Sequence, residues 1–140
     1  VFVNMVAGPI DMNNGMFDLR QGHTTRVDES QPVPSTLVSE AARTLIAFSG
    51  VTILPDIPEY YRKYPALLNF LSAQKMPWKE SRTLAGEIGE YIVMMRETED
   101  SYLVGAATNE SGRTIDLPLS FLEKGKYTVE VIKTATMPTI

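Results

Sequence analysis

The pattern of apolar residues changes near Met76-Pro77, and this change limits the fold of the chain more than any other feature. Before it, short apolar runs alternate with longer segments that carry apolar residues at helical spacing, which is the order of an α/β fold. After it, short apolar segments separated by polar turns follow one another, and Tyr127–Ile132 has apolar residues at every second position, as in an all-β fold. The sequence therefore predicts two domains, residues 1–76 and residues 77–140.

The first of these domains contains two predicted strands and two predicted helical regions. Val1–Ala7 and Val51–Leu54 are short, almost wholly apolar runs, which predicts strands buried on both faces. Thr36–Phe48 has one apolar face and predicts a helix. A second helical region follows, and Pro65 is expected to kink or divide it. Between the first strand and the first helix, Asp11–Pro34 predicts a long polar loop.

Two parallel strands do not form a stable sheet alone, because such a sheet needs helices over both faces. A (β/α)8 barrel, the common solution, takes about 250 residues, far more than residues 1–76 provide. We therefore expect this half to be the C-terminal strands and helices of a (β/α)8 TIM barrel whose earlier strands lie upstream of the sequence.

The second domain, residues 77–140, predicts an antiparallel, β-sandwich-like fold. Short polar turns separate its apolar segments at intervals of roughly 10–12 residues, which favours a meander or half of a sandwich. The predicted strands are Tyr91–Arg96, Tyr102–Ala107, Thr114–Leu119 and Tyr127–Ile132.

Charge and composition exclude several classes of function. The formal net charge is -4, and the 13 Lys and Arg residues form no basic stripe, which argues against a nucleic-acid partner. No run approaches the ~18 apolar residues of a membrane span. There is no cysteine, so disulfides and thiolate metal sites are excluded. Composition does not indicate a localisation.

Two aspartates are candidates for the rim of a substrate pocket. Asp56 follows the predicted strand Val51–Leu54, and Asp11 follows the preceding one; barrel enzymes bind substrate at that end of their strands. Each has a structural alternative. Asp56 with Glu59 has the form of a helix capping box, and Asp11 stands in a turn-like Asp-x-Asn-Asn-Gly sequence.

The remaining candidates favour structural roles. Trp78 and Glu80 lie at the expected domain junction and predict packing between the two halves. The three tyrosines of the second helical region are more typical of helix packing than of sugar stacking. His23, the only histidine, has no partner signalled by spacing and is expected in a surface loop. Asn109-Glu110-Ser111 matches a glycosylation sequon, a short pattern that arises by chance.

Five segments in this order resemble the C-terminal part of glycoside hydrolase family 97, the bacterial α-glucosidases and α-galactosidases. They are "MVAGPIDMNNG", "SGVTILPDIPEYYRKYPALLNFL", "MPWKESRTLAGEIGEYIVMMRE", "YLVGAATNES" and "LPLSFLEKGKYTVEVI". The family often has Asp-Tyr-Thr-Pro-Gly where this chain has Asp11-Met12-Asn13-Asn14-Gly15. The resemblance therefore decides neither between glucoside and galactoside nor between inversion and retention.

The resemblance implies an exo-acting, calcium-dependent enzyme with an N-terminal β-sandwich, a catalytic barrel and a C-terminal β-domain. Its substrate would be an α-linked oligosaccharide, and its location the periplasm or the outside of the cell. The catalytic carboxylates and calcium ligands would lie upstream, so no catalytic or metal residue is expected in this chain, which alone should be inactive. Its partners would be the upstream barrel, the N-terminal domain and other subunits of a homo-oligomer.

Two other hypotheses remain open from the sequence. A non-catalytic carbohydrate-binding or oligomerisation β-module would expose aromatic residues on one strand face, and Tyr91, Tyr102 and Tyr127 suit either such a face or a core. A free-standing small α/β protein conflicts with the count of two strands.

Overall fold

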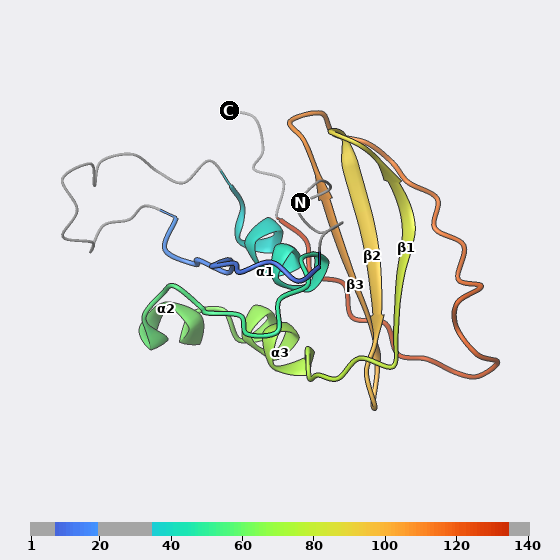
Figure 1. The fold of residues 1–140 in the computed structure, drawn as a ribbon, viewed down its shortest axis with the longest axis horizontal. Coiled ribbons are helices and arrows are strands. Elements are labelled where there is room, and N and C mark those ends of the chain that lie inside the picture. Colours follow the sequence, from blue (N-terminus) through green and yellow to red (C-terminus); the bar gives the residue numbers. More distant parts are fainter. Residues whose placement is uncertain (1–7, 20–34, 135–140) are drawn as a thin grey trace.

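The computed structural model describes residues 8–19 and 35–134, and in them the chain forms three helices and a three-stranded sheet (Figure 1). The predicted strand Val1–Ala7 and most of the predicted loop lie outside these ranges. The elements are α1 (Leu37–Ile46), α2 (Pro58–Arg62), α3 (Pro65–Ala73), β1 (Glu80–Glu87), β2 (Tyr91–Glu97) and β3 (Tyr102–Thr108). Helix α1 lies centrally, with the sheet on one side and α3 on the other.

Helix α1 confirms the prediction over Thr36–Phe48. Thr36 is its N-cap, and its hydroxyl accepts a hydrogen bond from the backbone N–H of Ser39 at 3.1 Å, which satisfies one of the free donors of the first turn. Leu45 and Ile46 are fully buried. The apolar face read from the sequence is therefore the face that packs.

The second helical region is divided, as predicted, by a proline. Pro58 and Pro65 each stand in the first turn of a helix, α2 and α3 respectively. Proline suits that position because its nitrogen has no hydrogen to leave unpaired and its φ is already helical. Tyr61 and Leu67 are buried and pack with Phe17 and Ala41 in one apolar cluster.

The sheet is an antiparallel meander in the order β1-β2-β3. Strands β2 and β3 confirm the predictions over Tyr91–Arg96 and Tyr102–Ala107. Strand β1 was not predicted, because its sequence ESRTLAGE does not alternate cleanly and its register shifts between Thr83 and Ala85. It forms because the short turn after Glu87 returns the chain antiparallel along β2.

Strand β2 is the centre of the second half, since Val93–Arg96 are buried without a break. Helix α1 covers one face, where Ala42 and Ile46 pack against Met94. The chain that follows β3 covers the other face (Figure 1). There Arg113 lies 5.0 Å from the ring of Tyr91, and Tyr102 contacts the rings of Phe121 and Tyr127 at 6.0 and 6.1 Å.

Three predicted strands are wrong. Thr114–Leu119 and Tyr127–Ile132 join no ladder, so the described residues form a single sheet rather than a sandwich. Alternating apolar residues predict an extended chain, whereas a strand also needs an edge with which to pair. Val51–Leu54 is not a strand either, and its only ladder contact is a parallel bridge between Thr52 and Met12.

Among the described residues, Val51 is 72% and Ile53 55% exposed. Their predicted burial is burial by neighbouring strands of a complete barrel, and it stays a prediction. The (β/α)8 barrel and the division into residues 1–76 and 77–140 stay predictions.

Gly105 sets how closely α1 approaches β3, and we expect Gly105→Ala to destabilise the fold. An added Cβ would lie 3.1 Å from the carbonyl oxygen of Ala42 and 3.2 Å from a methyl of Leu45. The backbone oxygen cannot rotate away, so the helix must shift, at about 1–3 kcal/mol in the free energy of unfolding. Urea denaturation of the two proteins measures this difference.

Gly112→Ala is the matched control, because a Cβ there meets no atom within 4 Å. It should change the free energy of unfolding by less than about 0.5 kcal/mol. Equal effects of the two substitutions would contradict the close contact at Gly105.

Candidate functional site

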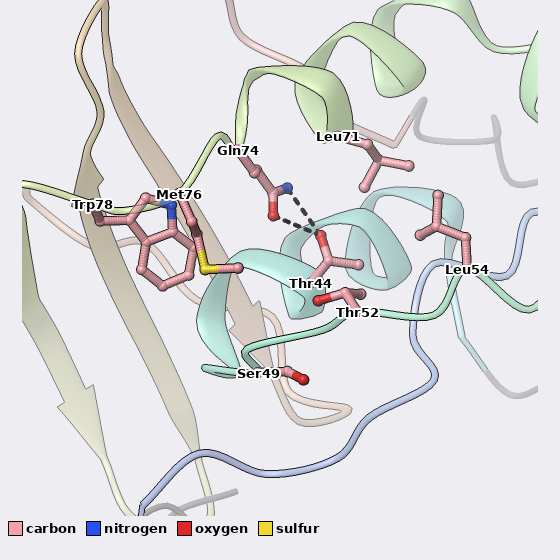
Figure 2. Close-up of a pocket in the computed structure, with 8 residues that line it drawn as sticks. All are labelled: Thr44, Ser49, Thr52, Leu54, Leu71, Gln74, Met76 and Trp78. Atoms are coloured by element: carbon pink, nitrogen blue, oxygen red, sulfur yellow. Dashed lines mark hydrogen bonds between the residues drawn. The ribbon is translucent and has the colours of Figure 1, made fainter.

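A cavity of about 190 Å³ lies between the end of α1, the segment after it and the end of α3 (Figure 2). It is lined by Thr44, Ser49, Thr52, Leu54, Leu71, Gln74, Met76 and Trp78. The side chains of Thr44 and Gln74 hydrogen bond to each other across it at 2.9 Å. Pockets that bury drug-sized ligands measure roughly 300 Å³ or more, so this cavity is too small to enclose a disaccharide.

No lining residue of this cavity carries a charge, so it offers no acid or base for hydrolysis. The indole Nε1 of Trp78 is buried and has no hydrogen-bond partner in the described part of the chain. An orphan N–H of this kind is costly. Within residues 8–19 and 35–134, we interpret the cavity as a packing gap.

Asp56, a predicted pocket-rim residue, ties two distant segments together. Its Oδ2 accepts hydrogen bonds from the backbone N–H groups of Phe17 at 2.9 Å and Asp18 at 2.6 Å. Its Oδ1 accepts one from the backbone N–H of Ile57 at 3.0 Å, and its own N–H donates to the hydroxyl of Tyr61 at 3.0 Å. The carboxylate is thus surrounded by donors, which is the arrangement that stabilises a negative charge.

The alternative prediction for Asp56, the N-cap of a capping box with Glu59, is wrong. The N-cap of α2 is Ile57, and no side chain caps that helix. Pro58 starts the helix one residue later than the capping box requires. Glu59 instead forms an exposed ion pair with Arg62 at 3.5 Å.

Asp11, the other predicted rim residue, is exposed and lies one residue before the bridge between Met12 and Thr52. Because the two bridged segments run in parallel, both continue toward the same end. The carboxylate of Asp56 meets the chain at Phe17 and Asp18 rather than at Asp11. The role of either residue at a pocket rim stays a prediction.

Two residues that fix this region were not singled out from the sequence. Glu40 is 4% exposed, and its Oε2 accepts a hydrogen bond from the backbone N–H of Gly15 at 3.3 Å. Gly15 has a φ of 93°, where a Cβ would also crowd Leu54 and Thr44, so only glycine fits without strain. The sequence Asn13-Asn14-Gly15 already indicated a turn at this glycine. The hydrogen bond from Gly15 to Glu40 could not be predicted, because the two residues are 25 positions apart in the chain.

Two tyrosines of the second helical region, Tyr61 in α2 and Tyr64 before α3, pack against Phe17, as the sequence favoured. Phe17 lies against Tyr61 with ring centroids 5.0 Å apart and against Tyr64 at 5.9 Å. Burial raises the pKa of the Tyr61 hydroxyl. Desolvation and then a hydrogen bond with Asp18 raise the pKa of Tyr60. Both hydroxyls therefore stay protonated at neutral pH and act as hydrogen-bond groups.

Trp78 and Glu80 belong to different surroundings. Trp78 contacts Phe48 at 5.6 Å between ring centroids, and the guanidinium of Arg96 lies 4.4 Å from its ring. Glu80 lies on β1, where its Oε1 accepts a hydrogen bond from Nε of Arg82 at 3.1 Å. The wider role of both residues at a domain junction stays a prediction.

Arg96 joins the sheet to α1 and was missed in the sequence, where its strand reads as apolar. It is 5% exposed. Its Nε donates to the carbonyl of Leu45 at 3.1 Å and its Nη2 to that of Ile46 at 3.0 Å, the last two residues of α1. A cation at a helix C-terminus satisfies free carbonyls and opposes the helix dipole. Burial lowers the pKa of Arg96.

A metal centre is not formed by the part of the chain that the structure describes. No three His, Cys, Asp or Glu residues there come together as ligands, and His23 lies outside that part. Among the described helices, none has the length and apolar character that a membrane span requires.

Residues 77–138 match the family model described as "Glycosyl-hydrolase 97 C-terminal, oligomerisation". They contain the sheet and the extended chain that covers it. Residues 77–138 form a C-terminal domain of glycoside hydrolase family 97. This confirms the family that the five sequence segments indicated.

Two curated relatives align with almost the whole chain. A "Retaining alpha-galactosidase" of Bacteroides thetaiotaomicron is 30% identical over 133 residues, which are 94% of this chain and 20% of the relative. A "Probable retaining alpha-galactosidase" of Streptomyces bingchenggensis is 26% identical over 131 residues, 94% of this chain and 19% of the relative. The chain therefore spans about a fifth of the length of these relatives.

Solved structures of other glycosidases are also similar to this chain. A glycoside hydrolase family 97 enzyme of Pseudoalteromonas sp. strain K8, in complex with acarbose, superposes with a TM-score of 0.73 and 30% identity, over 86% of this chain and 19% of that one. A beta-arabinopyranosidase gives a TM-score of 0.65 at 21% identity, over 76% of this chain and 17% of that one. The second match shows a shared fold alone.

Removal of the Arg96 guanidinium should separate the family 97 C-terminal sheet from α1. Arg96→Met keeps an apolar stem but leaves the carbonyls of Leu45 and Ile46 without their donors. We expect the free energy of unfolding to fall by about 2–3 kcal/mol, measured by urea denaturation.

Arg82→Met is the control, since Arg82 is an exposed arginine of the same sheet whose side chain pairs with Glu80. An exposed ion pair contributes at most about 1 kcal/mol. A similar loss in both variants would show that Arg96 does not act through the helix terminus.

Proposed function

We propose that the protein containing this chain is a retaining glycosidase of family 97 that acts on α-linked galactosides. In this proposal, the chain supplies the end of the catalytic barrel and the C-terminal domain through which subunits assemble. The substrate class follows the names of the two curated relatives. An α-glucoside is the competing substrate, because the sequence resemblance covers both enzyme types.

The observation that carries the proposal is the extent of the alignment. The family model covers residues 77–138, whereas the Bacteroides relative aligns with 94% of the chain. Similarity therefore continues through the helices and through the Asp11 and Asp56 segments. A detached β-module would be expected to align over the second half only.

Local geometry supports the barrel interpretation. Met12 and Thr52 form a parallel bridge, and α1 lies between them in the chain. Two parallel segments joined through a helix are the unit from which such barrels are built. The exposed Val51 and Ile53 are then residues that a neighbouring barrel strand would cover.

Catalysis in this proposal requires groups from outside the described residues. Retaining glycosidases use two carboxyl groups about 5–5.5 Å apart, and the resemblance places them upstream. Calcium would also be bound upstream, because the described acidic residues form no ligand cluster and so do not fit the ion. Asp11 would contribute at the rim, as a hydrogen-bond acceptor for sugar hydroxyls. We propose a periplasmic or secreted location on the same resemblance.

The second candidate function is a non-catalytic module. The family description names oligomerisation, which favours a subunit-contact role for residues 77–138 and is compatible with the enzyme. Sugar binding is less well supported. Tyr91 is covered by Arg113, and Tyr102 by Phe121 and Tyr127, so neither ring presents a free platform for a sugar.

The substrate can be tested on the full-length protein with p-nitrophenyl α-galactoside and p-nitrophenyl α-glucoside. We expect faster hydrolysis of the galactoside, retention of the anomeric configuration by NMR, and loss of activity on chelation that added calcium restores. Residues 1–140 alone should hydrolyse neither compound. Preference for the glucoside would correct the substrate, and activity on neither would contradict the glycosidase.

Asp11→Asn in the full-length protein tests the rim residue. Asp11 is exposed, so its substitution should leave the melting temperature unchanged while kcat/KM falls, because a neutral amide is a weaker acceptor for sugar hydroxyls. Normal activity with a lower melting temperature would assign Asp11 to the turn alone.

A further inference from the structure

The Gly15–Asp18 segment is held by two carboxylates from distant parts of the chain. Asp56 accepts the backbone N–H groups of Phe17 and Asp18, and buried Glu40 accepts that of Gly15. Asp56 is 39 residues from Phe17 and 38 from Asp18 in the sequence, and Glu40 is 25 residues from Gly15. We call this arrangement, Gly15–Asp18 with Asp56 and Glu40, the carboxylate clamp.

Aromatic packing of the Phe17 side chain also holds the segment of the carboxylate clamp in place. Phe17 is 3% exposed and contacts the rings of Tyr61 and Tyr64. The backbone N–H of Asp56 donates to the hydroxyl of Tyr61. The side chain of Phe17 and the backbone of Phe17 and Asp18 are thus fixed against residues 56–64, which include α2, so this segment has little freedom to move independently of them.

The clamp also limits the exposed stretch before it. Met12 is bridged to Thr52, and Gly15 is the first clamped residue. Asn13 is exposed between Met12 and Gly15, and the exposed Asp11 lies between Met12 and Ile10, whose backbone N–H donates to the carbonyl of Phe48 at 2.9 Å. A stretch of this length between two fixed points presents its polar side chains in a narrow range of orientations.

We propose that Asp56 is a positioning residue, which orients the Asp11–Asn14 stretch for substrate binding without touching the substrate. This inference rests on the proposed glycosidase function, in which that stretch lies at the substrate end of the barrel. Backbone donors occupy both carboxylate oxygens of Asp56. The residue therefore acts through the chain it holds, unlike the exposed carboxylate of Asp11.

The test compares Asp56→Asn and Asp56→Ala with wild type in the full-length enzyme. Asparagine keeps one acceptor oxygen for the Phe17 and Asp18 donors, and alanine keeps none. The assays are run well below the melting temperature of the least stable variant. We expect KM for p-nitrophenyl α-galactoside to rise about 10-fold in Asp56→Ala and by less in Asp56→Asn. The kcat of either variant should change by less than about 2-fold. Hydrogen exchange in a peptide covering residues 11–19 should quicken in the same order.

Glu59→Gln is the matched control, since it removes a carboxylate three residues along the chain, on α2 and outside the clamp. It should change neither KM nor exchange. A lower melting temperature with unchanged KM in Asp56→Ala would overturn the inference and leave Asp56 a purely structural residue. Unchanged exchange over residues 11–19 would also overturn it.

The two proposals can fail separately. A wild-type enzyme that hydrolyses no α-glycoside contradicts the proposed function, and the positioning role falls with it. An active wild type whose Asp56 variants bind substrate normally contradicts the positioning role alone. If Asp56→Ala does not fold, Asp56→Asn carries the comparison, because it retains the acceptor that faces Phe17 and Asp18.

Discussion

The contact of Arg96 with the end of α1 is the interaction on which the arrangement of the described chain depends. A guanidinium at 5% exposure loses most of its hydration, which must be offset by fixed dipoles. The carbonyls of Leu45 and Ile46 and the face of Trp78 provide them. Helix, sheet and connecting segment therefore meet at one side chain, and α1 cannot slide along β2 without leaving that charge unsolvated.

A second contact sets how closely α1 approaches the sheet. Gly105 lets the helix backbone come within van der Waals distance of β3, while Met94 and Ile46 fill the space beside it. On the opposite side of α1, Ala41 joins the cluster around Phe17 and Tyr61. One short helix thus carries both apolar clusters, which couples the proposed barrel end to the family 97 C-terminal domain.

Sequence patterns predicted elements well where local chemistry decides the outcome. The helix predicted over Thr36–Phe48, the division at Pro65 and the strands predicted over Tyr91–Arg96 and Tyr102–Ala107 each depend on residues close together in the chain, and each was confirmed. Strand β1 was missed and Thr114–Leu119 was wrongly assigned because pairing depends on an edge elsewhere in the chain. Asp56 was wrongly assigned as a cap for the same reason, since its partners Phe17 and Asp18 are remote in sequence.

The sequence by itself determined the helical spacing of α1, the break at Pro65, the change in the spacing of apolar residues near Met76, and the family. All four depend only on neighbouring residues or on the order of segments along the chain. Only the tertiary structure decided which polar groups meet. Arg96 reads as one charged residue at the end of an apolar strand, and Glu40 as an ordinary first-turn acid. Their roles arise because folding brings backbone donors and acceptors from far along the chain to them, where burial makes each contact strong.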